Sequence, residues 1–99
     1  IYTGFRPAWI MIKCSSINST NWVIDDAARS IVNPVDLGLQ ANENAGESSS
    51  QSFRLDFLSN GFKVRSTGVG ADVNRGNLIY AAFAENPFGG ENAAPATAR

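Results

Sequence analysis

An Asn-Gly pair between two alternating runs is the feature that most constrains the fold of this chain. Residues 52–65 read Ser-Phe-Arg-Leu-Asp-Phe-Leu-Ser-Asn-Gly-Phe-Lys-Val-Arg, and Asn-Gly in such a context is a strong signal for a two-residue β-hairpin turn. With Asn60 and Gly61 as the central turn residues, the expected cross-strand pairs are Ser59 with Phe62, Leu58 with Lys63, Phe57 with Val64, and Asp56 with Arg65. The last is an opposite-charge pair, which contributes about 0.2–1 kcal/mol.

The two faces of this hairpin differ sharply in polarity, because side chains alternate between the faces of a strand. One face collects Phe53, Leu55, Phe57, Phe62 and Val64, and the other collects Arg54, Asp56, Leu58, Lys63 and Arg65. The pattern predicts an antiparallel sheet with one face in the core and one face in water.

Four other segments are typical of strands: Ala8–Cys14, Asn21–Asp25, Leu37–Ala41 and Asn77–Ala84. The first has apolar groups on both faces, as expected of a central strand, and the second is expected to pair back on it. The alanines of Asn77–Ala84 leave a helix as an alternative there, and Asp26–Ser30 could form a single helical turn. Six strand candidates at short spacing predict an all-β fold, an antiparallel β-sandwich or jelly-roll-like domain.

Composition narrows the function classes. The chain has 99 residues, 43% of them apolar, which suits one small domain or part of one. Its formal charge is −1 and its eight basic residues are scattered, so no basic patch for nucleic acid is visible. The longest strongly apolar run, Ala8–Ile12, is too short to insert across a membrane.

The chain has one cysteine, Cys14, and no histidine. This excludes an intrachain disulfide, a cysteine-based zinc site and Ser-His-Asp or Cys-His catalysis. The serines at 48–50 therefore have no histidine to activate them, and Cys14 is expected to be a small buried apolar side chain. The opening Ile1–Phe5 shows no signal peptide and reads as the middle of a longer polypeptide, so we expect the chain to be a fragment.

Several acidic and glycine-rich patterns suggest sites only weakly. Gly68-Val-Gly70 lacks the third glycine and the helix of a dinucleotide-binding loop and is expected to be a turn. Asp25 and Asp26 could serve as calcium ligands with Asp72 or Glu43 and Glu47, but their spacing matches no calcium loop. Neighbouring strand residues also point apart, so we predict no metal site, no cofactor and no catalytic residue.

Three large rings, those of Trp9, Trp22 and Tyr80, could form a platform for stacking on a sugar. Each lies in an apolar run, which favours a place in the core. Trp22 is the best exposed candidate, because it stands near a strand start beside Asn21. Asn18-Ser19-Thr20 fits the N-glycosylation pattern, which has meaning only in a eukaryotic secretory route.

Four segments of the chain together carry a family resemblance. They are Thr3–Lys13 (Thr-Gly-Phe-Arg-Pro-Ala-Trp-Ile-Met-Ile-Lys), Asn21–Asp25 (Asn-Trp-Val-Ile-Asp), Asp56–Lys63 (Asp-Phe-Leu-Ser-Asn-Gly-Phe-Lys) and Tyr80–Phe88 (Tyr-Ala-Ala-Phe-Ala-Glu-Asn-Pro-Phe). In this order they resemble a β-rich module of tail-fibre and other virion structural proteins of tailed, often marine, bacteriophages. The resemblance covers residues 1–88 and leaves 89–99 as a Gly/Ala/Pro-rich tail or linker.

The resemblance implies a compact, lectin-like β-domain without a catalytic site, within a protein made in the bacterial host cytoplasm and assembled into the virion. Such modules differ in their loops, here residues 15–20, 42–51 and 66–76, and recognition is expected there. The expected function is a non-enzymatic tail-fibre or tail-adhesion domain that displays loops for host attachment by binding surface glycan. Expected partners are other virion proteins and further copies of the chain, as a trimer or a multicopy assembly.

Two alternatives remain open at this point. The domain could be purely structural, as a capsid decoration or tail connector, and apolar outer faces on its edge strands would favour that. It could instead belong to a polysaccharide depolymerase, for which Asp25, Asp26, Asp56 and Asp72 are the available carboxyls.

Overall fold

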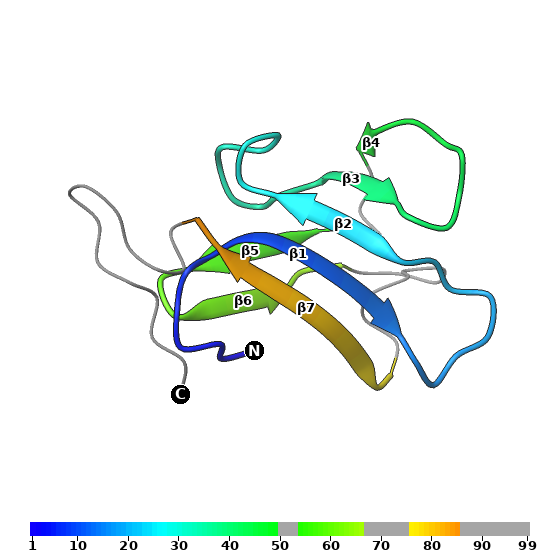
Figure 1. The fold of residues 1–99 in the computed structure, drawn as a ribbon, viewed down its shortest axis with the longest axis horizontal. Helices are drawn as coiled ribbons and strands as arrows, with labels where there is room; N and C mark the ends of the chain where they lie inside the picture. Colours follow the sequence, from blue (N-terminus) through cyan, green and yellow to red (C-terminus); the bar gives the residue numbers. More distant parts are fainter. Residues whose placement is uncertain (50–53, 67–75, 86–99) are drawn as a thin grey trace.

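The chain folds into two packed antiparallel sheets. The computed structural model describes residues 1–49, 54–66 and 76–85. Its strands are β1 (Pro7–Cys14), β2 (Val23–Asp26), β3 (Leu37–Gln40), β4 (Ser48–Ser49), β5 (Leu55–Leu58), β6 (Gly61–Val64) and β7 (Leu78–Ala84). Five of them form a sheet in the order β4-β3-β2-β1-β7, and β5 and β6 form a second sheet (Figure 1). The predicted all-β sandwich class is therefore confirmed.

The strands predicted from sequence are present, with ends that differ by at most two residues. β1 is central, between β2 and β7, and pairs antiparallel with both. The helical alternative for Asn77–Ala84 is wrong, because Leu78–Ala84 forms β7. The segment Asp26–Ser30 makes the single turn that the sequence allowed, in which the Ser30 amide donates to the Asp26 carbonyl at 3.4 Å. The predicted tail 89–99 and the glycines at 68 and 70 lie outside the described residues.

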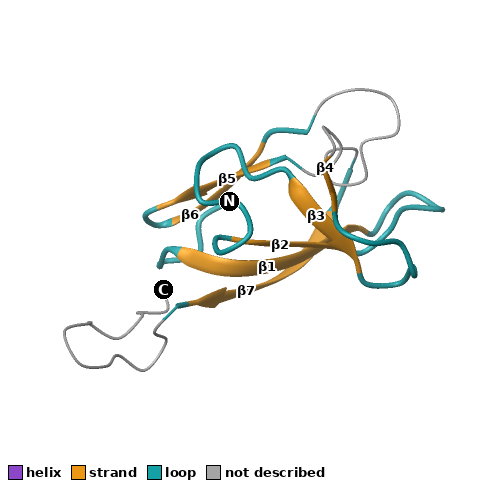
Figure 2. Cartoon of the chain, turned by 90° about the horizontal axis from the view of Figure 1, so that it is seen from above, coloured by secondary structure: helices purple, strands orange, loops and turns teal. Residues whose placement is uncertain are grey.

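The core lies between the β5–β6 hairpin and one face of the large sheet (Figure 2). Alternation along β1 turns Ile10, Ile12 and Cys14 into this core, where all three are fully buried. The other members of the buried cluster are Val23 from β2, Val35, Leu55 and Phe57 from β5, and Phe62 from β6. Trp9, Met11 and Lys13 point to the opposite face and are only half-buried, so the expectation that this strand is buried on both sides is wrong for the described residues.

The hairpin has the predicted faces but a different register. The observed pairs are Leu55 with Val64, Asp56 with Lys63, Phe57 with Phe62, and Leu58 with Gly61. The turn is therefore centred on Ser59 and Asn60, one residue earlier than predicted. Because each residue of the first strand pairs two positions away from its predicted partner, an even shift, every described side chain keeps its predicted face. The Asp56–Arg65 ion pair survives as a diagonal contact, with 3.5 Å between Oδ2 and Nε.

Gly61 explains the shifted register. A Cβ at Gly61 would lie 2.0 Å from the carbonyl oxygen of Ile1. The N-terminal segment runs beside β6 at this point: the Phe62 amide donates to the Ile1 carbonyl at 2.9 Å, and the Thr3 amide donates to the Asn60 carbonyl at 2.9 Å. Glycine is thus required here for close backbone approach rather than for a left-handed turn conformation.

The other edge of the hairpin is closed in a similar way. Val35 and Leu55 exchange two backbone hydrogen bonds of 2.6 and 3.0 Å. The Asn33 side chain continues the ladder, because its amide donates to the Phe57 carbonyl and its oxygen accepts from the Phe57 amide, both at 2.9 Å. Two short segments therefore hold the hairpin in place over the large sheet.

We predict that Gly61→Ala destabilises the domain by about 1–3 kcal/mol, because the new methyl group forces the N-terminal segment away from β6. The free energy of unfolding in urea measures this. Gly46→Ala is the matched control, since a Cβ at Gly46 meets nothing within 4 Å, and it should change stability by less than about 0.5 kcal/mol. Equal stability of the two variants would contradict the assigned role of Gly61.

Candidate functional site

Three connections converge at one end of the large sheet. β1 and β3 end there, and β2 and β7 begin there, because β1 pairs antiparallel with β2 and β7, and β2 pairs antiparallel with β3. The end is built from residues 15–22, residues 41–47 and the described end of the β6–β7 connection, Gly76 and Asn77. We call this set the loop end; Figure 1 shows its β1–β2 and β3–β4 connections. The three loops that the family resemblance singled out, residues 15–20, 42–51 and 66–76, thus each begin or end at the loop end.

The β1–β2 loop is tied down by a buried threonine. Thr20 is 7% exposed. Its hydroxyl donates to the Cys14 carbonyl at 3.0 Å and accepts from Lys13 Nζ at 2.8 Å. Ser19, just before it, has a left-handed φ of 62°, a conformation uncommon outside glycine. These contacts give the loop a defined shape from its first residue to Thr20.

Asparagine side chains join the β1–β2 loop to the β3–β4 loop. The Asn42 oxygen accepts from the Trp22 amide, and the Asn42 amide donates to the Asn21 side-chain oxygen, both at 2.9 Å. The Trp22 carbonyl in turn accepts from the Ala41 amide at 3.0 Å. The backbone of Trp22 is therefore held from both sides, while its side chain is half-buried on the sheet.

Two serines join the β1–β2 loop to the start of β7. The Ser15 amide donates to the Asn77 carbonyl at 2.7 Å, and the Asn77 amide donates to Ser16 Oγ at 2.9 Å. Gly76 packs closely here, since a Cβ on it would lie 2.2 Å from Ser16 Oγ. The β3–β4 loop and the described end of the β6–β7 connection are thus both linked to the β1–β2 loop, the former by hydrogen bonds and the latter by hydrogen bonds and close packing.

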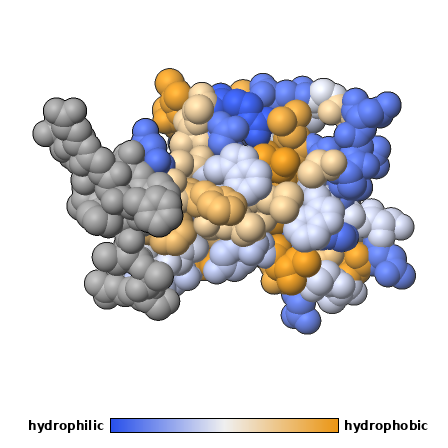
Figure 3. All heavy atoms as spheres, in the orientation of Figure 1, coloured by the Kyte–Doolittle hydropathy of each residue, from blue (hydrophilic) through white to orange (hydrophobic). Residues whose placement is uncertain are grey.

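The sheet face turned away from the hairpin is largely apolar. Figure 3 views this face, and apolar and weakly polar spheres fill its centre. The registers place Trp9 beside Phe83, and Met11 between Ala81 and Ile24. The Trp9 and Phe83 rings lie 5.4 Å apart between centroids. We call this surface the outer face; no strand among the described residues covers it.

The predicted platform of three rings does not form. Trp9 and Trp22 lie towards opposite ends of the large sheet, and Tyr80 points to the other face, where it meets Phe62 edge-on at 5.1 Å. Full burial in the core is also wrong for these rings, because Tyr80 is 42% exposed and the two tryptophans are half-buried. Cys14 is buried, as expected.

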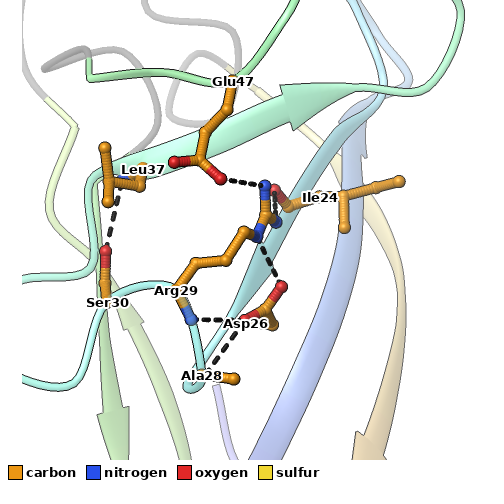
Figure 4. Close-up of polar contacts among 7 residues, drawn as sticks. All are labelled: Ile24, Asp26, Ala28, Arg29, Ser30, Leu37 and Glu47. Atoms are coloured by element: carbon orange, nitrogen blue, oxygen red, sulfur yellow. Dashed lines mark hydrogen bonds and ion pairs between the residues drawn. The ribbon is translucent and has the colours of Figure 1, made fainter.

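Arg29 organises a polar network that sequence patterns did not reveal. Its Nε lies 2.5 Å from Asp26 Oδ2, and its other nitrogens donate to the Ile24 carbonyl at 3.1 Å and to Glu47 Oε2 at 3.4 Å (Figure 4). Asp26 also accepts the amides of Ala28 and Arg29 at 3.0 and 2.7 Å. These bonds from Arg29 hold the pKa of Asp26 below its ordinary value, against the opposing effect of its partial burial. The network joins the end of β2 to the segment before β4.

The described acidic residues proposed as calcium ligands do not form one cluster. Asp26 and Glu47 share Arg29, and Asp25 points into the core, whereas Asp72 lies outside the described residues. Within residues 1–49, 54–66 and 76–85, no three acidic or cysteine side chains are grouped as a metal site would require.

A small hollow lies beside the segment between β2 and β3. Its walls include Arg6, Ile31, Asn33 and Phe57, and its volume is about 110 Å³. Pockets that enclose small organic ligands usually measure about 300–1,000 Å³. This hollow is therefore too small to be a ligand site of that kind.

Asp25 is buried in the core face of β2, opposite Ile10 on β1. Neither carboxyl oxygen has a hydrogen-bond partner among the described residues. Burial raises the pKa of Asp25 to about 8; the charge of Arg29 opposes this rise, and the charges of Asp26 and Asp36 add to it. The carboxyl is consequently protonated at neutral pH in the folded chain, because an ionised group at this position would be desolvated without compensation.

We predict that this carboxyl makes the domain less stable as the pH rises from about 4 to about 8. In that window Asp25 is ionised in the unfolded chain and protonated in the folded chain, so each pH unit lowers the free energy of unfolding by about 1.4 kcal/mol. The contribution is fully present below the unfolded pKa and is lost as the pH passes the folded pKa. Urea unfolding at several pH values measures this slope.

Asp25→Asn tests the assignment, because an amide does not titrate and the slope should disappear whatever the absolute stability of the variant. Asp56→Asn is the control, since Asp56 is a partly exposed carboxyl on the hairpin, and it should keep the slope. A pH slope that persists in Asp25→Asn would contradict the assignment.

Comparison with known proteins places the chain in one family. The family described as a domain of unknown function (DUF7483) matches residues 1–87, and the chain belongs to it. No curated protein and no solved structure matches the chain.

Proposed function

We propose that this DUF7483 domain is a non-enzymatic structural domain of a bacteriophage virion, in a tail fibre or tail-adhesion protein, and that its loop end contacts glycan on the host surface. The observation that carries this proposal is the convergence of the three connections at one end of a rigid sheet. Recognition residues are commonly displayed on loops that a rigid scaffold positions. The virion setting rests on the resemblance of residues 1–88 to phage tail-fibre modules.

The chemistry of the loop end suits a sugar ligand. Trp22 offers a half-buried ring at the edge of the outer face, and such rings supply contact area at low entropic cost. Extending the register by one residue beyond the Ile12–Val23 pair places Lys13 opposite Trp22. The side-chain amides of Asn21 and Asn42 lie next to Trp22, along the chain and across the loops, where Asn42 accepts from the Trp22 backbone amide. Amides can both donate to and accept from sugar hydroxyls.

A second candidate, a purely structural role as a capsid decoration or tail connector, is favoured by a different observation. β7 is an edge strand, and its outer-face side chains Ile79 and Phe83 are 46% and 57% exposed. Between them on the same face lies Ala81, and Phe83 packs beside Trp9. Continuous exposed apolar surfaces are typical of interfaces with other proteins. On this alternative the outer face, rather than the loop end, is the working surface.

The depolymerase alternative finds less support in the placement of the carboxyls. Asp25 is enclosed in the core, Asp26 is occupied by Arg29, and Asp56 lies on the hairpin beside Arg65. The fourth candidate, Asp72, lies outside the described residues.

We propose the virion as the location of the protein, on the same family resemblance. Separately, no helix among the described residues is able to span a membrane.

We predict that beads carrying many copies of the chain bind host cells and compete with phage for attachment, because multiple weak contacts add to a useful avidity. Trp22→Ala should lower cell binding at least about tenfold, the effect expected of an aromatic contact worth about 2 kcal/mol. Flow cytometry of fluorescent beads on the cells measures this.

Trp9→Ala is the matched control, because Trp9 is also half-buried on the outer face but lies near the opposite end of β1. It should leave cell binding unchanged. Equal binding by both variants would remove Trp22 from the contact. Absence of binding by folded wild-type beads would favour the structural role instead.

A further inference from the structure

Among the described strands, β7 has the longest edge without a partner. The hairpin is closed on one side by residues 1–3 and on the other by residues 33–35. At the far edge of the large sheet, β4 has only two residues, both serines. β7 forms the other edge, and no described residue pairs with its outer side along seven residues.

β7 also lacks the features that normally protect an edge. Soluble proteins interrupt long edge strands with charges, prolines or bulges, or keep them short. From Leu78 to Ala84 the sequence is Leu-Ile-Tyr-Ala-Ala-Phe-Ala, without charge or proline. The bulge in the β1–β7 pairing lies on the β1 side, between Pro7 and Trp9. An apolar strand of this length whose outer edge pairs with no described residue is a template for another strand.

We propose that β7 pairs antiparallel with β7 of a second copy, about a two-fold axis at Ala81, which joins the two large sheets into one. Ala81 is the central residue of Leu78–Ala84, so this register is the one that overlaps all seven residues of both strands. Two-fold symmetry makes the contact self-complementary, as in most homodimers.

The side chains fit this register. On the outer face, Ile79 lies opposite Phe83 of the second copy, an aliphatic–aromatic pair of a kind that stabilises sheets. On the core face, Tyr80 lies opposite Ala82 of the second copy, so a large side chain meets a small one. At the axis, Ala81 meets Ala81 of the second copy, where a larger pair would crowd.

Charge also agrees with a second copy as the occupant. Residues 77–84 carry no charge, so the antiparallel pair opposes no like charges along its length. Glu85, the nearest charged residue, lies opposite Asn77 of the second copy rather than another carboxylate. The pairing also makes the outer faces continuous across the new edge, and Phe83, 57% exposed in one chain, gains a neighbour there.

Sedimentation velocity of the 99-residue chain over a concentration series tests the proposal. The wild-type chain should form a dimer at micromolar concentrations. Ala81→Lys and Ala81→Glu each place two like charges opposite one another at the axis, and each should raise the dissociation constant about fivefold or more. An equimolar mixture of the two variants should restore a one-to-one dimer, because lysine then meets glutamate.

Met11→Lys is the matched control, since Met11 is the β1 neighbour of Ala81 on the same face but not at the edge. It should still form the dimer; if it does not, the copies associate through the outer face, and the proposal is overturned. A monomer at all concentrations, or a mixture of the two Ala81 variants that does not associate, also overturns it.

Crosslinking provides a test that needs no destabilising charge. Ala81→Cys should form an intermolecular disulfide under mild oxidation, because directly opposite Cβ atoms lie about 4.5–5.5 Å apart. The native Cys14 is fully buried and does not compete. Met11→Cys should not crosslink, and equal crosslinking of both variants would overturn the edge-to-edge geometry.

Discussion

The structure depends on how one small hairpin covers one face of a five-stranded sheet. A two-stranded hairpin is at best marginally stable by itself, so β5 and β6 must be held by more than their own pairing. Leu55, Phe57 and Phe62 bury their side chains against the core face of the large sheet. Residues 1–3 and 33–35 complete the backbone pairing on the two sides of the hairpin. Apolar burial and edge closure therefore act together, and loss of either exposes the core.

The packing of the hairpin on the large sheet requires the buried Asp25 carboxyl to stay protonated. Asp25 occupies a position where alternation along β2 demands a core residue, and its side chain has no described hydrogen-bond partner. A buried carboxyl in this setting is tolerated only while it stays neutral. The packing of the two sheets is therefore coupled to the protonation of Asp25. Burial raises the pKa of this carboxyl most, the charge of Arg29 opposes the rise, and the charges of Asp26 and Asp36 add to it.

The sequence was sufficient to predict six of the seven strands and the core faces of the hairpin, because both follow from local alternation. It missed β4, whose two serines lie in the segment 42–51 that was expected to be a polar loop. The hairpin register was not predictable locally, since Gly61 is fixed by the backbone of Ile1, sixty residues away along the chain. The Arg29 network was missed for a similar reason: Glu47 comes from a separate loop. At the candidate site, the loops could be named from the sequence, but their convergence depends on strand order. Trp22 was identified by its neighbours alone, and the hydrogen bonds that hold its backbone come from Asn42 and Ala41.

The proposed pairing of β7 fixes the directions in which the loop ends of the two copies point. β7 begins at the loop end and runs away from it, so in an antiparallel β7 pair the loop ends of the two copies point in opposite directions. A two-fold pair of this kind cannot place both loop ends on one flat surface. Avidity for a host surface would then have to come from further copies on the particle, while the β7 pair would join neighbouring domains. If both proposals hold, the loop end would face outward from the assembly, and the β7 edge would lie within it.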